Sequence, residues 1–234
     1  MHSTDTEVAI ARSSIPRVFR TWAGHTFCIG ICLLFLLLAA GPQGSPAWSS
    51  EIIPAHPAIG RLNHAGFKSR AHCTSFAIRD GALITAAHCL PKINSDTVHV
   101  LLGYAQGTLQ HHSSTEASAY RTLPDRDIAA LCEFPELNGK MTLAQNTPSP
   151  GTKVTVRGYG APKVHVLQET SCSVQTVSKP GFVMLDCALP PGASGAPVTI
   201  AETSDIIGLV SASAPTRTLV SRLTPDILER LCEW

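Results

Sequence analysis

Short apolar runs, separated by turn-forming residues, make up most of the chain from about residue 60 onward. The runs are rich in Val, Ile, Leu and Thr, and Gly, Pro, Ser or Asn bound them, which is typical of strands joined by tight turns. This spacing predicts an all-β barrel or sandwich. The expected strands are 74–78, 82–87, 97–104, 127–134, 153–159, 164–177, 182–189, 196–200, 205–212 and 218–223.

The end of the chain has a helical pattern instead. Thr224 can cap a helix, and Pro225 suits its first position. We therefore expect a helix over 225–233, whose apolar residues share one face. The stretch 137–151, with the sequence LNGKMTLAQNTPSPG, is expected to be a linker between two halves.

One hairpin can be placed from the sequence. Asp80-Gly81 lies between the apolar runs TSFAI and ALITAA, and this dipeptide is a strong signal for a two-residue turn. Such a turn places Arg79 opposite Ala82 and Cys73 opposite His88. Because Cys89 follows His88, we expect a Cys73–Cys89 disulfide.

The N-terminal segment has the pattern of an export signal. Arg12, Arg17 and Arg20 precede the uncharged apolar run 27–40, and small residues follow it. The run is shorter than the roughly 18 residues of a membrane span. We interpret 1–47 as a signal peptide that is cleaved at its end, with an uncleaved signal anchor as the alternative. The protein would then be secreted or periplasmic, with no membrane contact once the signal is removed.

Composition and charge exclude few function classes. Hydrophobic residues (44%) suffice for a core, and charged residues (15%) are too few for a disordered chain of this length, 234 residues. The net charge of +1 gives no electrostatic reason to expect nucleic-acid binding. The eight cysteines include Cys28 and Cys32 of the signal, and the six that remain suggest disulfides in an exported chain. No Cys-x-x-Cys pair indicates zinc, so we expect neither a metal nor a cofactor.

Three stretches carry residues suited to nucleophilic catalysis. LITAAHCL contains His88, DRDIAAL contains Asp127 and PPGASGAPV contains Ser194. A serine that attacks a peptide bond needs a base, and the base needs a carboxylate that fixes its tautomer. The developing oxyanion needs backbone N–H groups, and Gly192 permits the necessary turn. A packed histidine, a strand-edge charge and an ordinary turn serine are the structural alternatives.

Together these motifs resemble the chymotrypsin/trypsin-like serine protease family, from about Ala58 to the C-terminus. TAAHC with a cysteine fifteen residues before its histidine, then DIAAL, then G-x-S-G-x-P, occur in the family's order. The resemblance implies a protease domain over 48–234 with two six-stranded antiparallel β-barrels, at about 58–140 and 150–223. The active site would lie in the cleft between the barrels, and a C-terminal helix would follow.

The resemblance also assigns roles to single residues. His88 would be the general base, Asp127 its orienting carboxylate and Ser194 the nucleophile. The N–H groups of Gly192 and Ser194 would form the oxyanion hole. Ser211 would lie beside the catalytic carboxylate and the substrate backbone.

Three further assignments follow from the resemblance. Asp125 is a rival carboxylate, but the apolar IAAL of the motif must follow the catalytic residue, which favours Asp127. A Cys172–Cys187 disulfide would staple the second barrel. A Cys132–Cys232 disulfide would join the terminal helix to the first barrel.

The chain departs from the trypsin pattern beside the nucleophile. Ala193 stands where trypsins carry the Asp that binds a new N-terminal ammonium, and no IVGG start appears. Activation by that ion pair is therefore not expected. The form C-x-x-x-P-G-x-S-G-x-P-V looks closer to bacterial secreted members that resemble the glutamyl endopeptidase group.

The expected substrate-binding residues are Ala188, Ser211, Ser213 and Thr218. Ala188 replaces the trypsin carboxylate, which disfavours Arg/Lys specificity. Val210 stands where the glutamyl endopeptidase group has a His, which disfavours acidic specificity. Ser213 and Thr218 replace glycines of the pocket wall and would narrow the pocket, so we expect a small or medium apolar side chain before the cleaved bond (P1).

The expected function is that of a monomeric serine endopeptidase acting on protein or peptide substrates through an acyl-enzyme. A catalytically inactive binding protein on the protease scaffold is the alternative. An esterase is disfavoured, because GASGA lacks the G-x-S-x-G spacing and the chain lacks βαβ alternation. His111-His112 could bind a metal, but a polar loop rich in Ser and Thr is more often solvated.

Overall fold

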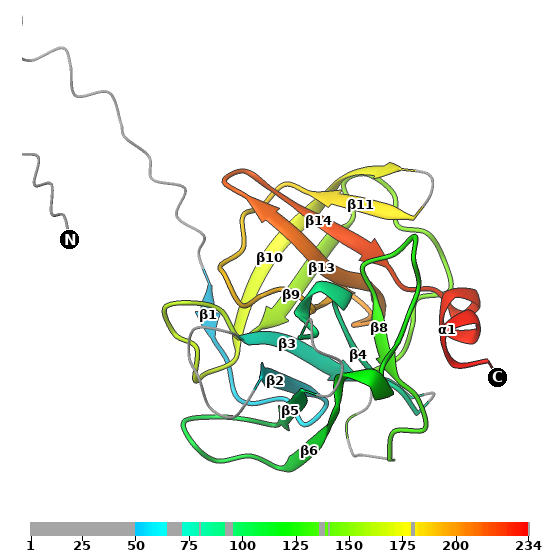
Figure 1. Cartoon of the computed structure of the whole chain (residues 1–234). Coiled ribbons are helices and arrows are strands. Elements are labelled where there is room, and N and C mark those ends of the chain that lie inside the picture. The colour runs from blue at the N-terminus through cyan, green and yellow to red at the C-terminus, as the bar shows by residue number, and fades with distance from the viewer. Residues whose placement is uncertain are drawn as a thin grey trace, which may run out of the picture. The chain divides into compact units, whose positions relative to one another are not determined.

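The computed structural model describes residues 50–64, 72–79, 81–91, 96–135, 139, 141–178 and 181–233. The signal peptide predicted at 1–47 lies outside these residues. Within the described part, the named strands form two antiparallel sheets. In Figure 1 the first is drawn in cyan to green, and the second in yellow-green to red apart from the light-blue β1. No helix of this part is long and apolar enough to cross a membrane.

The second sheet is a closed barrel. Six strands pair in a ring, because β9 pairs with both β12 and β10. A seventh, β1 (Glu51–Ile52), is added at β10. The ring consists of β9 (Lys153–Gly158), β10 (Gln168–Ser178), β11 (Phe182–Leu185), β14 (Arg217–Arg222), β13 (Ile206–Ala214) and β12 (Pro197–Ile200). Alternate aliphatic residues fill it, such as Val154, Val183, Val198 and Val220. The predicted second barrel is thus confirmed.

The first sheet is a curled half-barrel. Its order is β6 (His111–Glu116), β5 (Thr97–Leu102), β2 (Ile59–His64), β3 (His72–Ala77), β4 (Leu83–Thr85), β8 (Ala129–Leu131) and β7 (Arg121–Thr122). Its two edge strands, β6 and β7, are consecutive in the chain and are joined by the 3-10 helix η2 (Ala117–Ala119). The chain bends at η2, and its continuation β7, not β6, pairs with the free edge of β8. The described residues therefore contain no ladder between β6 and β8, and the first of the two predicted barrels is a curled half-barrel.

The β3–β4 hairpin differs from its prediction by one residue. Phe76 pairs with Ile84, and the N–H of Ile78 donates to the carbonyl of Ala82 at 3.0 Å. The connection therefore has three residues, with Gly81 at a φ of +77°. A three-residue hairpin commonly ends with glycine in this conformation, so the predicted pairing of Arg79 with Ala82 is wrong.

Three disulfides fasten the fold. Cys73–Cys89 joins β3 to the 3-10 helix η1 (Ala87–Cys89), and Cys172–Cys187 joins β10 to the segment after β11. Cys132–Cys232 links the end of β8 to the helix α1 (Pro225–Cys232). These are the expected pairs. Figure 1 shows α1 beside β8, and its buried residues Ile227, Leu228 and Leu231 belong to the core of the first sheet.

Candidate active site

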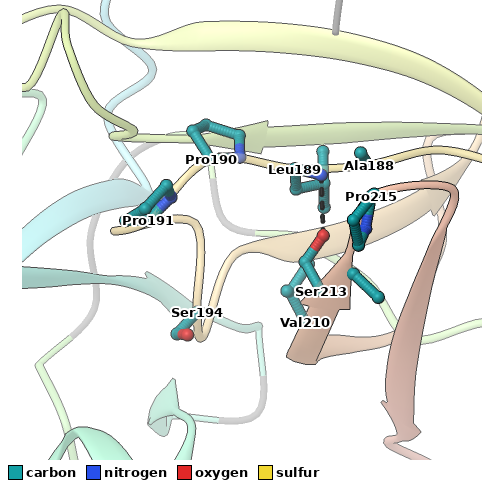
Figure 2. Close-up of a pocket in the computed structure, with 9 residues that line it drawn as sticks. Ala188, Leu189, Pro190, Pro191, Ser194, Val210, Ser213 and Pro215 are labelled. Carbon is teal, nitrogen blue, oxygen red and sulfur yellow. Dashed lines mark hydrogen bonds between the residues drawn. The ribbon is translucent and has the colours of Figure 1, made fainter. Parts of the chain in front are cut away.

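The candidate catalytic residues come from both sheets. His88 lies in η1, directly after β4, and Asp127 lies two residues before β8. Ser194 lies in the loop between β11 and β12, and Figure 2 shows its side chain at the edge of a pocket. Ser211 lies in β13. The fold therefore brings His88, Asp127 and Ser211 into contact across more than a hundred residues of chain.

Asp127 holds His88 by two hydrogen bonds. Nδ1 of His88 lies 2.7 Å from one carboxylate oxygen, and the His88 backbone N–H donates to the other at 2.9 Å. A carboxylate only accepts hydrogen bonds, so the proton of the neutral imidazole is on Nδ1. Nε2 then presents its lone pair, which is the tautomer that a general base requires. Ser211 also donates its hydroxyl to Asp127, at 2.6 Å.

These contacts shift the pKa of both partners. The hydrogen bond to Asp127 raises the pKa of His88 above its ordinary value, although partial burial opposes the shift. Burial disfavours the charge on Asp127, but hydrogen bonds from His88 and Ser211 outweigh it and lower the pKa of the carboxyl group. The pair is thus held as a carboxylate beside an imidazole that readily accepts a proton.

Asp125, the rival carboxylate, is engaged elsewhere. Its two oxygens lie 3.6 Å from Nε of Arg126 and 3.7 Å from a guanidinium nitrogen of Arg230. This arrangement favours Asp127 as the partner of His88.

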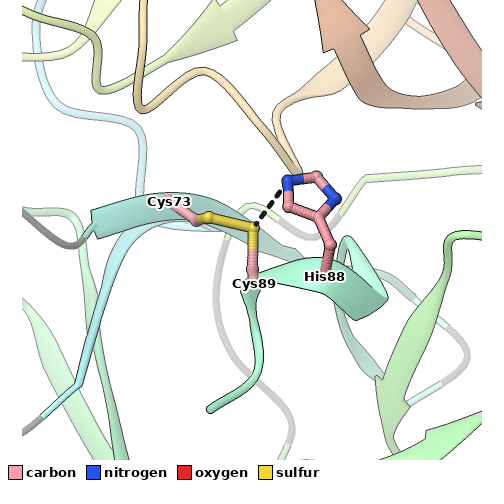
Figure 3. Close-up of side chains that lie close together, drawn as sticks. All are labelled: Cys73, His88 and Cys89. Atoms are coloured by element: carbon pink, nitrogen blue, oxygen red, sulfur yellow. Dashed lines mark hydrogen bonds between the residues drawn. A yellow bond between two sulfur atoms is a disulfide. The ribbon is translucent and has the colours of Figure 1, made fainter. Parts of the chain in front are cut away.

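Within the part of the chain that the structure describes, no hydrogen bond joins the Ser194 hydroxyl to Nε2 of His88. This nitrogen lies 3.8 Å from Sγ of Cys89 (Figure 3). Hydrogen bonds between nucleophile and base are often long in free enzymes and shorten when substrate binds.

His88 and the adjacent disulfide do not form a metal site. Among the described residues, one group of three potential ligands lies close together, namely Cys73, His88 and Cys89. Figure 3 shows that the two sulfur atoms are bonded to each other. Because metals bind thiolates, the disulfide removes two of the three ligands.

The loop before Ser194 is fixed by hydrogen bonds of its carbonyl groups. The carbonyl of Pro191 accepts from the N–H of Ala161 at 2.9 Å. The carbonyl of Ala193 accepts from the N–H of Ala196, also at 2.9 Å. In a trans peptide the N–H points opposite to the carbonyl, so these two bonds orient the N–H groups of Gly192 and Ser194. Among the described residues neither N–H has an acceptor within the protein, and both are available for an oxyanion.

Gly192 is required by both its backbone conformation and its surroundings. Its φ is +99°, which favours glycine. A Cβ at this position would lie 2.6 Å from the carbonyl oxygen of Tyr159 and would also clash with Nε2 of His72. The sequence pointed to this glycine through the motif but could not show what surrounds it.

A cavity of about 440 Å³ opens beside Ser194. In Figure 2 the segment 188–191 forms one side, and β13 with the following turn forms the other. The lining residues are Ala188, Leu189, Pro190, Pro191, Ser194, Val210, Ser213, Ala214 and Pro215. None of these side chains carries a charge, so the cavity suits an uncharged, mainly apolar group.

The hydroxyl groups of Ser213 and Thr218, behind this cavity, hydrogen-bond to each other and to the backbone. Thr218 donates to the carbonyl of Cys187 at 2.8 Å, so its oxygen accepts the proton of Ser213 at 3.0 Å. Ser213 in turn accepts from the N–H of Leu189 at 2.7 Å. Of the expected pocket residues, Ala188 and Ser213 line the cavity, whereas Thr218 is fully buried behind Ser213 and Ser211 contacts Asp127.

The chain is similar to known proteins in sequence and in fold. The model of the trypsin-like peptidase domain matches residues 73–209. No curated protein matches the chain.

Solved structures similar to this chain share its fold at low sequence identity. The protease Anisep from Arthrobacter nicotinovorans has a TM-score of 0.60 at 16% identity, covering 78% of this chain and 97% of its own. A Glu endopeptidase has a TM-score of 0.62 at 18% identity, with coverages of 77% and 93%. Human heparin binding protein has a TM-score of 0.61 at 18% identity, with coverages of 78% and 92%. The family match covers more than half of the chain, and the chain therefore belongs to the trypsin-like peptidase domain family.

Proposed function

We propose that this protein is a serine endopeptidase that hydrolyses peptide bonds through an acyl-enzyme. The observation that carries the proposal is the doubly hydrogen-bonded His88–Asp127 pair. This pair belongs to the same site as Ser194, and in the described residues the N–H groups of Gly192 and Ser194 have no hydrogen-bond acceptor within the protein. A histidine with a purely structural role does not need its proton fixed on Nδ1 and its Nε2 exposed. A general base needs both.

In the proposed mechanism, Nε2 of His88 accepts the Ser194 proton as Oγ attacks the substrate carbonyl carbon. Asp127 stabilises the imidazolium, and the N–H groups of Gly192 and Ser194 stabilise the oxyanion. The imidazolium then protonates the leaving amine, which breaks the peptide bond. A water molecule, deprotonated by the same imidazole, hydrolyses the acyl-enzyme and restores Ser194.

We further propose a small or medium apolar P1 side chain. The cavity beside Ser194 has no charged lining residue, and Ser213 lines its wall, where a glycine would leave more room. A basic or acidic P1 group would lose its hydration without gaining a counter-charge. Arg/Lys and acidic specificities are therefore disfavoured.

Activity would not depend on a trypsin-like N-terminal ion pair. Ala193 is buried and has no charge to offer an ammonium group. The hydrogen bonds from Ala161 and Ala196 support a loop that is already arranged for catalysis. Three disulfides support export of the protein to a secreted or periplasmic location.

The alternative is a catalytically inactive binding protein on the same scaffold. A human heparin binding protein is among the similar structures, so the fold alone does not separate the two functions. The intact set of His88, Asp127 and Ser194 favours the enzyme.

Cleavage of a proteome-derived peptide library tests activity and specificity together. The folded wild type should cut after small or medium apolar residues, and Ser194→Ala should not cut at all. A folded wild type that leaves the library intact would support the binding protein. Equal cleavage by Ser194→Ala would reject the assigned nucleophile.

A further inference from the structure

Thr74 makes a set of contacts with the nucleophile loop that the catalytic roles above do not include. It lies in β3 and is fully buried. Its backbone N–H donates to the carbonyl of Ser194 at 2.8 Å. Its hydroxyl donates to the carbonyl of Gly192 at 3.1 Å and accepts the N–H of Tyr159 at 3.0 Å. One residue of the first sheet thus holds the carbonyls of both residues whose N–H groups face the proposed oxyanion.

Thr74 is itself held in place. The hydroxyl of Thr85, in the neighbouring strand β4, donates to the Thr74 carbonyl at 2.9 Å. Both threonines are fully buried, so water does not compete for these bonds. The contact chain therefore runs from β4 through β3 to the loop of the second barrel.

We propose that the Thr74 hydroxyl is a positioning group that keeps the oxyanion hole formed in the absence of a carboxylate at Ala193. This inference rests on the proposed function. The peptide between Gly192 and Ala193 has its carbonyl bound to Thr74 and its N–H bound to the carbonyl of Pro190 at 3.0 Å. Both ends of this peptide are fixed, which resists a rotation that would turn the adjacent Gly192 N–H away from the oxyanion.

Thr74→Val tests the hydroxyl, because it keeps the side-chain shape and removes both hydrogen bonds. We expect kcat to fall at least about tenfold with little change in KM, since the oxyanion interaction exists mainly in the transition state. Thr74→Ser, which keeps the hydroxyl, should restore kcat to within a few-fold of the wild type. Thr74→Ala is a second hydroxyl-free variant should Thr74→Val fail to fold.

Thr199→Val is the matched control. Thr199 is a buried threonine of β12 that donates to the carbonyl of Thr155 at 3.3 Å, outside the catalytic site. It should leave kcat unchanged. A folded Thr74→Val or Thr74→Ala with wild-type kcat would overturn the role of Thr74 and leave the proposed function standing. An inactive wild type would instead reject the proposed function.

A second, independent observation concerns two histidines on the first sheet. Nδ1 of His99 in β5 and Nε2 of His112 in β6 form a hydrogen bond at 3.0 Å, and the planes of the two rings are nearly parallel, at 13°. His112 is opposite Leu101, so His99 and His112 are diagonal neighbours on one face of the sheet. His112 is exposed and His99 partly exposed. Two imidazole nitrogens bound to one tetrahedral zinc ion are about 3.3 Å apart. An ion that displaces the proton of this hydrogen bond could therefore bind both nitrogens with little movement of the rings.

The geometry also points to a divalent transition-metal site formed by His99 and His112. The ion would be of the class that prefers imidazole, such as Zn²⁺, Ni²⁺ or Cu²⁺, with water in the remaining positions. Thirteen positions separate the two residues in the chain, so their spacing in the sequence did not indicate the site.

Titration of the full chain with Zn²⁺ alone, followed by calorimetry, tests this site. His99→Ala and His112→Ala should each weaken one binding event at least tenfold, because a chelate becomes a single imidazole contact. His111→Ala is the matched control, since His111 lies on the opposite face of β6, against Phe134. The site is rejected if both variants bind Zn²⁺ with the wild-type stoichiometry and affinity.

Discussion

At the scale of single residues, the proposed chemistry depends on one imidazole held in one tautomer. His88 makes both of its bonds to Asp127 through N–H donors, which leaves Nε2 as its acceptor. Ser211 adds a third bond to the same carboxylate. An Asp127 carboxylate with three donors stays charged, and this charge is what makes His88 an effective base.

The pH dependence of hydrolysis tests this arrangement. The base must be unprotonated, so kcat/KM should fall as the pH drops through the His88 pKa. Because the hydrogen bond to Asp127 raises the pKa of His88, the midpoint should lie above the ordinary imidazole value of about 6.5. Asp127→Asn should lower kcat by about 10⁴-fold and move the midpoint to lower pH. A midpoint at or below 6.5 in the wild type would contradict the assignment.

Pocket specificity is also decided by single residues. Ser213→Gly should enlarge the cavity, because the Ser213 side chain lines its wall (Figure 2). We expect kcat/KM for a large apolar P1, such as Phe, to rise about tenfold relative to Ala. Kinetics on a matched pair of peptides measure this ratio. An unchanged ratio would show that Ser213 does not set the pocket size.

At the scale of elements, the loop between β11 and β12 is the part that presents catalytic groups. Its carbonyls are bound by Ala161, by Ala196 and by Thr74 of the other sheet. The loop is therefore arranged by its neighbours rather than by its own turn sequence alone. Its oxyanion glycine, Gly192, has a positive φ and no room for a Cβ.

Gly192→Ala should lower kcat by at least about 10²-fold, comparable to the loss of an oxyanion donor. The added Cβ cannot coexist with the Tyr159 carbonyl 2.6 Å away, so the loop must move. Gly151→Ala is a suitable control, because Gly151 also has a positive φ, +89°, but nothing within 4 Å of the added Cβ. It should lose some stability and keep its activity, whereas equal kcat values for the two variants would contradict the account.

The elements also show what the sequence could predict. The predicted bounds of strands with several β-branched residues, such as β13 and β14, lie close to the observed bounds. The same holds for α1, which follows Thr224. The strand β6, HHSSTE, was predicted to be a polar loop, because its less exposed positions carry polar residues as well as its exposed ones. The catalytic residues could be predicted because their motifs are specific. Thr74 could not, because its partners come from segments more than 80 residues away.

At the scale of the whole described domain, two sheets and a terminal helix are tied together. Cys132–Cys232 spans 100 residues of sequence and fastens α1 to the end of β8. Cross-links over long loops restrict the unfolded chain most. The first sheet stays open between β6 and β8 because the chain bends at η2, and no pattern in the sequence indicated this bend.

Replacing both Cys132 and Cys232 by Ala should lower the free energy of unfolding by about 2–5 kcal/mol. Denaturant unfolding of the oxidised proteins measures the difference. Catalysis should persist below the new transition, because neither cysteine touches His88, Asp127 or Ser194. A loss well under 1 kcal/mol would show that the helix is held by packing of its buried face alone.

The central claim is that Ser194 is a nucleophile activated by His88. Treatment of the folded wild type with a serine-reactive fluorophosphonate, followed by peptide mass spectrometry, tests it most directly. The account predicts one adduct per chain, on Ser194, and none in folded Ser194→Ala or His88→Ala. Absence of an adduct on the folded wild type, or an adduct on another residue that persists in Ser194→Ala, would contradict it.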